Sequence, residues 1–199
     1  MYKTILILIC IFILICIYLS HNINTLEIAQ YTIKNKKIPK EFDGYNIVQI
    51  SDLHSKSFGK NNIKLLQKIK SLNPDIIVIT GDLVDGENNN YDIALNFMKE
   101  LTKLYKVYYI IGNHEQKALI KKYKQEYIKY FEELNQIDFI NLDDDKVKIQ
   151  KNNSKINLYG LTVPYSCYKY LFDDKEITTI DSKFLEQKLG DLNKNEFNI

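Results

Sequence analysis

Arginine is absent from this 199-residue sequence, so all 27 basic side chains are lysines. An anionic ligand therefore finds no bidentate guanidinium, and its charge must be neutralised by lysines, histidines, backbone N–H groups or metal. The formal net charge of +2 is close to zero. Because binding of a nucleic-acid backbone requires a cationic surface, we expect no nucleic acid as a partner.

Cysteine and histidine are also scarce, with three residues of each. Cys10 and Cys16 lie inside an apolar run and Cys167 stands alone, so the cysteines form no disulfide framework. The hydrophobic content of 45% and the charged content of 26% are ordinary for a globular protein. The length allows one good-sized domain and a short extra segment.

That extra segment is an unbroken apolar run at residues 5–19, preceded by Lys3. The run is slightly shorter than the roughly 20 residues that span a bilayer, so we weigh a cleaved signal peptide against a retained anchor. It ends without the small residues that cleavage requires, and no lipoprotein signal surrounds its cysteines. We therefore expect residues 1–20 to be a transmembrane signal-anchor of a single-pass cell-membrane protein. The positive charge before the run favours a main domain outside the cytoplasm.

Residues 21–43 are polar, and we expect them to be a tether with one strand at residues 25–33. Residues 44–199 form the main domain, in which short β-branched runs alternate with helical spacing of apolar residues. The expected strands are residues 45–51, 76–80, 107–111, 137–141, 146–150 and 156–161. The expected helices are residues 61–72, 91–104, 117–134 and 182–192. This alternation predicts an α/β fold.

Three polar motifs follow the first three strands: Asp52-x-His54, Gly81-Asp82 and Gly112-Asn113-His114-Glu115. Ligands of α/β sheets bind outside the carboxyl ends of the strands, where these motifs lie. A single Asp-x-His pair is more often a turn with an ordinary surface histidine, and Asp82 alone is explained equally well as a turn or helix cap. The recurrence after three strands favours a divalent metal site, because carboxylates and imidazoles are metal ligands.

Together the motifs resemble those of the calcineurin-like metallophosphoesterase family, most closely its membrane-associated bacterial phosphohydrolases, from about residue 45 onward. The resemblance implies an α/β sandwich of mixed β-sheets flanked by helices, with two adjacent divalent metal ions. Their ligand types suit Mn, Fe or Zn. By resemblance, Asp52 and His54 bind the first metal, Asp82 bridges both and Asn113 binds the second. His114 is then the catalytic residue that contacts the phosphate.

Asp85 and Glu115 lie beside these motifs, and we expect them to orient the ligating imidazoles. The implied reaction is hydrolysis of a phosphate ester by in-line attack of a metal-bridging hydroxide. The anchor favours a lipid-linked or cell-envelope phosphate as substrate. A nuclease or cyclic-nucleotide phosphodiesterase of the same superfamily is the alternative enzyme. A non-catalytic metal-binding or scaffold protein is the alternative from another class.

The sequence departs from the family pattern after His114, because no later residue is a histidine. The pattern needs one further histidine and a Gly-His-x-His pair to complete both metal shells. Residues 196–199 look like the opening of another strand, so we interpret the chain as truncated before those motifs. We expect the 199 residues alone to hydrolyse phosphate esters weakly or not at all.

Overall fold

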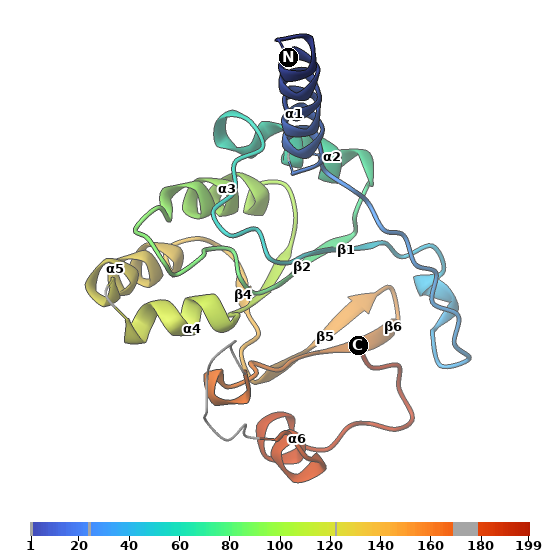
Figure 1. Ribbon diagram of the computed structural model, residues 1–199. Helices are drawn as coiled ribbons and strands as arrows, with labels where there is room; N and C mark the ends of the chain where they lie inside the picture. Colours follow the sequence, from blue (N-terminus) through green and yellow to red (C-terminus); the bar gives the residue numbers. More distant parts are fainter. Residues whose placement is uncertain (1, 24, 122, 169–178) are drawn as a thin grey trace. The chain divides into compact units, whose positions relative to one another are not determined.

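The computed structural model describes residues 2–23, 25–121, 123–168 and 179–199 (Figure 1). These residues divide into two compact units, Met1–Ile33 and Lys34–Ile199. The first unit contains helix α1, Tyr2–Ile23, in which residues 2–19 are long and apolar enough to cross a membrane. The segment after α1 forms no strand, so the prediction at residues 25–33 is wrong. None of the described strands pairs with it, and an unpaired strand is not stable in water.

The larger sheet of the second unit consists of β1, Ile47–Ile50; β2, Ile76–Thr80; β3, Val107–Ile110; and β4, Ile140–Asn141. Its strands lie in chain order, and every described pair is parallel. The bounds of β2 agree with the predicted strand at both ends. The other three strands are shorter than predicted, because the predicted residues beyond their observed ends pair with no neighbouring strand.

Helices α2, Ile63–Ser71; α3, Asp92–Thr102; α4, Asn113–Ile120; and α5, Lys124–Leu134 connect the parallel strands. A 3₁₀ turn at Lys60–Asn62 precedes α2. Because crossovers between parallel strands are right-handed and the strand order never reverses, all these helices lie on one face of the sheet. Figure 1 shows α3, α4 and α5 on that side and the remaining strands on the other.

The single helix predicted at residues 117–134 is two helices, and this prediction is wrong in two ways. The first begins earlier, at Asn113, because the carboxylate of Glu115 accepts the backbone N–H of Gly112 and caps the start of α4 directly after β3. The chain then leaves the helix at Lys121, which is extended with φ −111° and ψ −165°. Several lysines three or four positions apart would repel one another in a continuous helix here. Residue 122 lies outside the described residues.

The smaller sheet pairs β5, Asp145–Lys151, with β6, Ser154–Gly160, in antiparallel orientation. The chain end adds a parallel bridge between Asn198 and Asn157, so this sheet is the mixed one. The strand predicted to open at residues 196–199 therefore begins beside β6. Further elements are 3₁₀ turns at Lys40–Phe42 and Tyr165–Cys167, and α6, Ser182–Leu189. Helix α6 ends before the predicted residue 192, because Gly190 adopts φ 68°.

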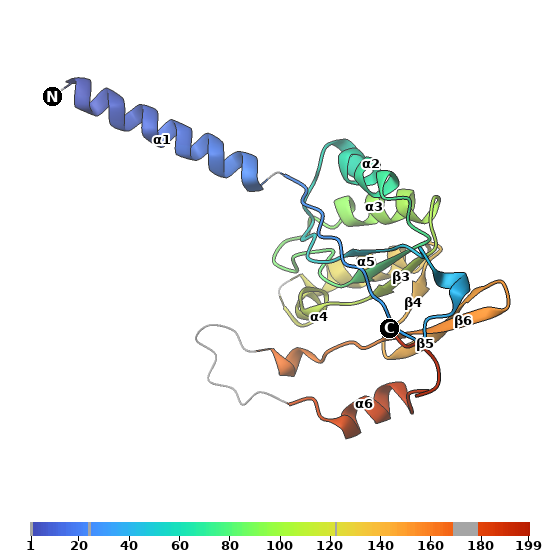
Figure 2. The same cartoon turned by 90° about the vertical axis from the view of Figure 1, so that its right-hand side faces the viewer.

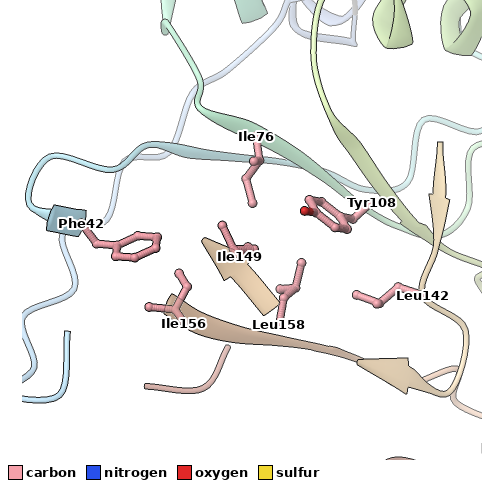
Figure 3. Close-up of a cluster of buried hydrophobic side chains, with 7 residues drawn as sticks. All are labelled: Phe42, Ile76, Tyr108, Leu142, Ile149, Ile156 and Leu158. Carbon is pink, nitrogen blue, oxygen red and sulfur yellow. The ribbon is translucent and has the colours of Figure 1, made fainter. Parts of the chain in front are cut away.

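The two sheets enclose an apolar core, drawn in Figure 3. It contains side chains from both sheets and from the first 3₁₀ turn: Phe42, Ile76, Tyr108, Leu142, Ile149, Ile156 and Leu158. Side chains at alternate positions of β2, such as Ile77 and Ile79, are buried on the helical side. Both faces of the parallel sheet are therefore covered, which explains its continuous apolar strands. The carboxyl edge of the parallel sheet is the part that remains available for a functional site.

Candidate metal centre

The loops that follow β1 and β2 run side by side beyond the end of the sheet. The backbone N–H of Asp52 donates to the carbonyl of Gly81 at 3.3 Å, and that of His54 donates to the carbonyl of Asp82 at 2.9 Å. Ser55 continues the pairing to Leu83 at 2.8 Å. The parallel register of the strands is thus extended into the loops, so the predicted ligands of two motifs become neighbours.

Three of the predicted site residues adopt a left-handed backbone that is uncommon outside glycine. The φ angles are 55° for Asp52, 49° for His54 and 55° for Asp82. Such conformations cost free energy and persist where the surrounding structure imposes them. Their concentration at one edge of the sheet marks these loops as a candidate site on geometric grounds alone.

The loops after β2 and β3 touch through two glycines. A Cβ atom on Gly112 would lie 2.1 Å from Oδ1 of Asp82, and one on Gly81 would lie 2.5 Å from the Cα of Gly112. Gly81 also adopts φ 92°, which side chains rarely tolerate. Both positions therefore require glycine, because it lets the loop that carries Asp82 approach the start of α4.

His54, Asp82 and His114 converge at this edge. Each offers one ligand atom, and the three atoms all lie within 4.8 Å of one another. Two donors bound to one ion at about 2.0–2.2 Å are separated by at most about 4.4 Å, so a small movement would let all three reach a single cation. The imidazole rings of His54 and His114 meet edge to face, with centroids 4.5 Å apart. One carboxylate oxygen and two imidazole nitrogens form a donor set that fits a divalent transition metal.

Asp52 and Asn113 flank this cluster. Oδ1 of Asp52 lies 3.5 Å from Nε2 of His54, and the Asp52 side chain is 65% exposed. Ser51 donates a hydrogen bond from Oγ to Oδ2 of Asp52 at 2.5 Å. Asn113 is the first residue of α4 and immediately precedes His114. All five residues predicted to contact metal or phosphate therefore lie in the loops after β1 and β2 or in the first turn of α4, at one edge of the sheet.

The orientation of the His114 ring is fixed by a contact with the main chain. Its Nδ1 contacts the backbone carbonyl oxygen of Asp85, and since a carbonyl only accepts, Nδ1 must carry the hydrogen. When the ring is neutral, the lone pair is then on Nε2. The carboxylate of Asp85 instead accepts hydrogen bonds from the backbone N–H groups of Glu87, at 2.8 Å, and Asn88, at 3.3 Å. Asp85 thus contacts the imidazole of His114 with its backbone carbonyl, while its carboxylate binds within its own loop.

Glu115 is a fully buried carboxyl group beneath the loops. It accepts hydrogen bonds from the backbone N–H groups of Asp82 at 2.8 Å, Gly112 at 2.9 Å and Val84 at 3.3 Å. Burial raises the pKa of Glu115, and the nearby Asp82 carboxylate adds to this, whereas the three N–H donors oppose it. These contacts of the carboxyl group are with the main chain and not with an imidazole. Glu115 therefore fixes the backbone of two motifs relative to each other.

Sequence reasoning missed the contacts that join this edge to the second sheet. Gln116 donates from Nε2 to the carbonyl of Val163 at 2.9 Å and accepts from the N–H of Tyr165 at 2.9 Å. Asp143 accepts from the N–H of Ile111 at 2.8 Å and from the hydroxyl of Thr162. These partners are 19 to 49 positions apart along the chain, and no local pattern indicates them.

A parallel sheet with carboxylate, amide and imidazole groups at the ends of three strands is the arrangement of a metal-dependent hydrolase. The model of the calcineurin-like phosphoesterase family matches residues 45–197, which is most of the chain. The chain belongs to this family of metallophosphoesterases.

Curated relatives agree with this assignment. The uncharacterized metallophosphoesterase YkuE of Bacillus subtilis is 34% identical over 94 residues, which are 45% of this chain and 33% of the relative. A transmembrane protein with metallophosphoesterase domain from Danio rerio is 26% identical, covering 45% and 21% of the two chains. The UDP-2,3-diacylglucosamine pyrophosphatase LpxG of Chlamydia muridarum is 30% identical, covering 43% and 28%. The matched segments thus span a third or less of these relatives. The apolar helix and the transmembrane relative indicate membrane association.

Proposed function

We propose that this protein is a membrane-anchored, metal-dependent phosphoesterase that hydrolyses a lipid-linked or cell-envelope phosphate ester. The observation that carries the proposal is the convergence of His54, Asp82 and His114 at the carboxyl edge of the parallel sheet. The LpxG relative is named for a substrate that carries acyl chains, which supports a lipid-linked ester. The apolar helix α1 would keep the domain beside such a substrate.

The proposed metal ligands are Asp52 and His54 for a first ion, Asp82 for both ions and Asn113 for a second. When bound, two divalent ions would withdraw charge from a phosphate and lower the pKa of a water molecule. Asp82 suits the shared position because it is buried, whereas Asp52 is exposed, and because it has two oxygens. One of these, Oδ1, also accepts the backbone N–H of His114 at 2.9 Å, which holds the carboxylate in place.

His114 is proposed to contact the phosphate. Since its Nδ1 hydrogen is bound by the carbonyl of Asp85, Nε2 is the atom that faces a ligand. Protonated Nε2 would stabilise negative charge on phosphate oxygens or donate its proton to the leaving group. The position of His114 within the cluster also suits direct metal binding, and the measurements below separate these two roles.

The first test is metal binding by the 199-residue chain. Calorimetric titration with Mn²⁺ should detect a site that His54→Ala and Asp82→Asn abolish. If His114 contacts phosphate, His114→Ala should retain most of the Mn²⁺ affinity. Activity is then measured on an aryl phosphate ester with a form extended to carry the C-terminal histidines of the family pattern. Metal binding without turnover in that form would favour a non-catalytic role.

The second test concerns membrane topology. We propose that residues 5–19 are a retained single-pass anchor and that the domain lies outside the cytoplasm. Membrane fractionation should recover the uncleaved chain with the membranes, and protease added to intact cells should degrade the domain. Release of a soluble form without its first twenty or so residues would contradict retention. Protection of the domain in intact cells would contradict the orientation.

A further inference from the structure

One stretch of the domain carries lysines and no acidic residue of its own. Between Asp52 and Asp75 the sequence contains five lysines and neither aspartate nor glutamate. For a chain with 27 lysines, 25 acidic residues and a net charge of +2, this is a strong local excess of positive charge. The stretch begins directly after the first motif of the metal site and covers the following loop and all of α2.

The folded structure exposes most of this charge. Lys60, Lys64, Lys68 and Lys70 are exposed on the 3₁₀ turn and α2, whereas Leu65, Leu66 and Ile69 form the buried side of the helix. Ile63 is 48% exposed at the start of α2, among these lysines. We call these four lysines and Ile63 the α2 face. Among the described residues, no carboxylate forms an ion pair with these lysines in the structure.

Helix α5 shows that this composition is particular to α2. It also exposes lysines, Lys124 and Lys129, and an apolar residue, Ile128, which is 36% exposed. However, α5 carries three glutamates as well, and Lys129 is paired with Glu133 at 3.7 Å. The two helices therefore present similar lysines and one isoleucine each, but α2 presents them without an acidic residue of its own.

The position of α2 leaves this face open. Figure 2 shows α2 at one end of the helical layer, beyond α3, so no further helix of the layer covers it. The loop at its start leads back to His54 of the metal site within ten residues. The nine residues from Thr25 to Ile33 that follow α1 reach at most about 30 Å, which keeps the domain close to whatever surface holds α1.

We propose that the α2 face is a docking surface for an anionic membrane, on which the lysines contact lipid phosphates and Ile63 enters the interface. Each lysine held near such a surface strengthens binding by roughly fivefold, so four of them favour the docked state strongly once α1 has tethered the domain. Docking would place the loop that carries the first motif near the lipid headgroups. The proposal goes beyond hydrolysis at the metal site, and its test requires no catalytic activity.

The absence of tryptophan provides a direct test. The full chain with Ile63→Trp contains one tryptophan, and Ile128→Trp on α5 is the matched control. Both are reconstituted into vesicles of neutral lipid or of neutral lipid with one-third anionic lipid, with bromine atoms on the acyl chains as quenchers. We expect the fluorescence of the Ile63→Trp variant to be quenched and blue-shifted only in anionic vesicles, and that of the control to be unchanged.

Charge is tested in the same vesicles. Combining Lys60→Gln, Lys64→Gln and Lys68→Gln should abolish the quenching, since three contributions of about fivefold are lost. Combining Lys121→Gln, Lys124→Gln and Lys129→Gln removes equal charge elsewhere and should preserve it. Raising the salt from about 0.1 M to 1 M shortens the Debye length from about 10 Å to 3 Å and should also abolish it.

Equal quenching of the Ile63→Trp variant in neutral and anionic vesicles, or none in either, would overturn the proposal. So would tight binding of a DNA oligonucleotide that the α2 lysine substitutions abolish while lipid quenching is absent, because the face would then bind nucleic acid. Failure of Mn²⁺ binding leaves these results unaffected, so the docking surface and the proposed enzyme function can fail separately.

Discussion

The two sheets of this domain have different roles: the parallel sheet carries the candidate metal site, and the antiparallel sheet contributes to the core. The parallel sheet ends in loops with left-handed residues, closely packed glycines and three converging ligand groups. The antiparallel hairpin is regular over all seven residue pairs and contributes Ile149, Ile156 and Leu158 to the core. The parallel sheet thus has strained backbone conformations at its carboxyl edge, whereas the antiparallel sheet packs against one face of the parallel sheet. Substitutions in the two sheets should therefore affect different measurements.

The largest expected effect is at Asp82. Asp82→Asn keeps an oxygen that can accept the N–H of His114, so the fold should survive, but the ligand loses its charge. We expect Mn²⁺ affinity to fall more than about 100-fold, because even groups that only orient a ligand are worth about 10–100-fold. Calorimetry measures it. Asp75→Asn, at the opposite end of β2, is the control, and equal losses in both variants would remove the distinction between the two ends of the strand.

His114→Ala should separate chemistry from binding. In a C-terminally extended, active form we expect kcat to fall about 10²–10³-fold, as for loss of one group that stabilises transition-state charge. Mn²⁺ affinity should change far less than in Asp82→Asn, since the phosphate contact and not the metal is removed. Steady-state kinetics and metal titration on the same preparation decide this. A loss of affinity as large as that of Asp82→Asn would make His114 a metal ligand.

The second sheet should respond in stability alone. Leu158 is 4% exposed in the core between the sheets, so Leu158→Ala should lower the free energy of unfolding by about 3 kcal/mol through lost burial and a cavity. Urea denaturation followed by circular dichroism measures this, with the exposed Leu104→Ala as a control within about 0.5 kcal/mol of the parent. The Mn²⁺ affinity of the folded variant should stay unchanged. If it falls with stability, the two sheets do not have separate roles.

The sequence predicted the structure best where the determining interactions are between residues close together in the chain. Strand β2 was bounded correctly because its β-branched run lies between Pro74 and Gly81, both of which interrupt regular structure. The candidate site residues could be expected to lie together because each follows a strand end, and a parallel sheet brings those ends together. The break at Lys121 was missed, since the apolar spacing continues across it. The hydrogen bonds made by Gln116 and Asp143 join residues far apart in sequence, and they form only when the two sheets pack together.

Substitution of Gln116 should have the smallest effect, and it tests most directly whether the segment after β6 influences the metal site. Its side chain is bound at both ends by the backbone of the segment after β6, at Val163 and Tyr165, while its own helix begins at the metal site. Gln116→Ala removes two half-buried hydrogen bonds, which should lower the free energy of unfolding by about 1 kcal/mol.

If these hydrogen bonds of Gln116 only hold the segment after β6 in place, hydrogen exchange should quicken at residues 163–168 and remain slow at residues 107–115. Mn²⁺ affinity should then match the parent, and Gln125→Ala, on the exposed side of α5, should alter neither measurement. Faster exchange that reaches residues 107–115, together with weaker Mn²⁺ binding, would instead show that the second region helps to position the metal ligands.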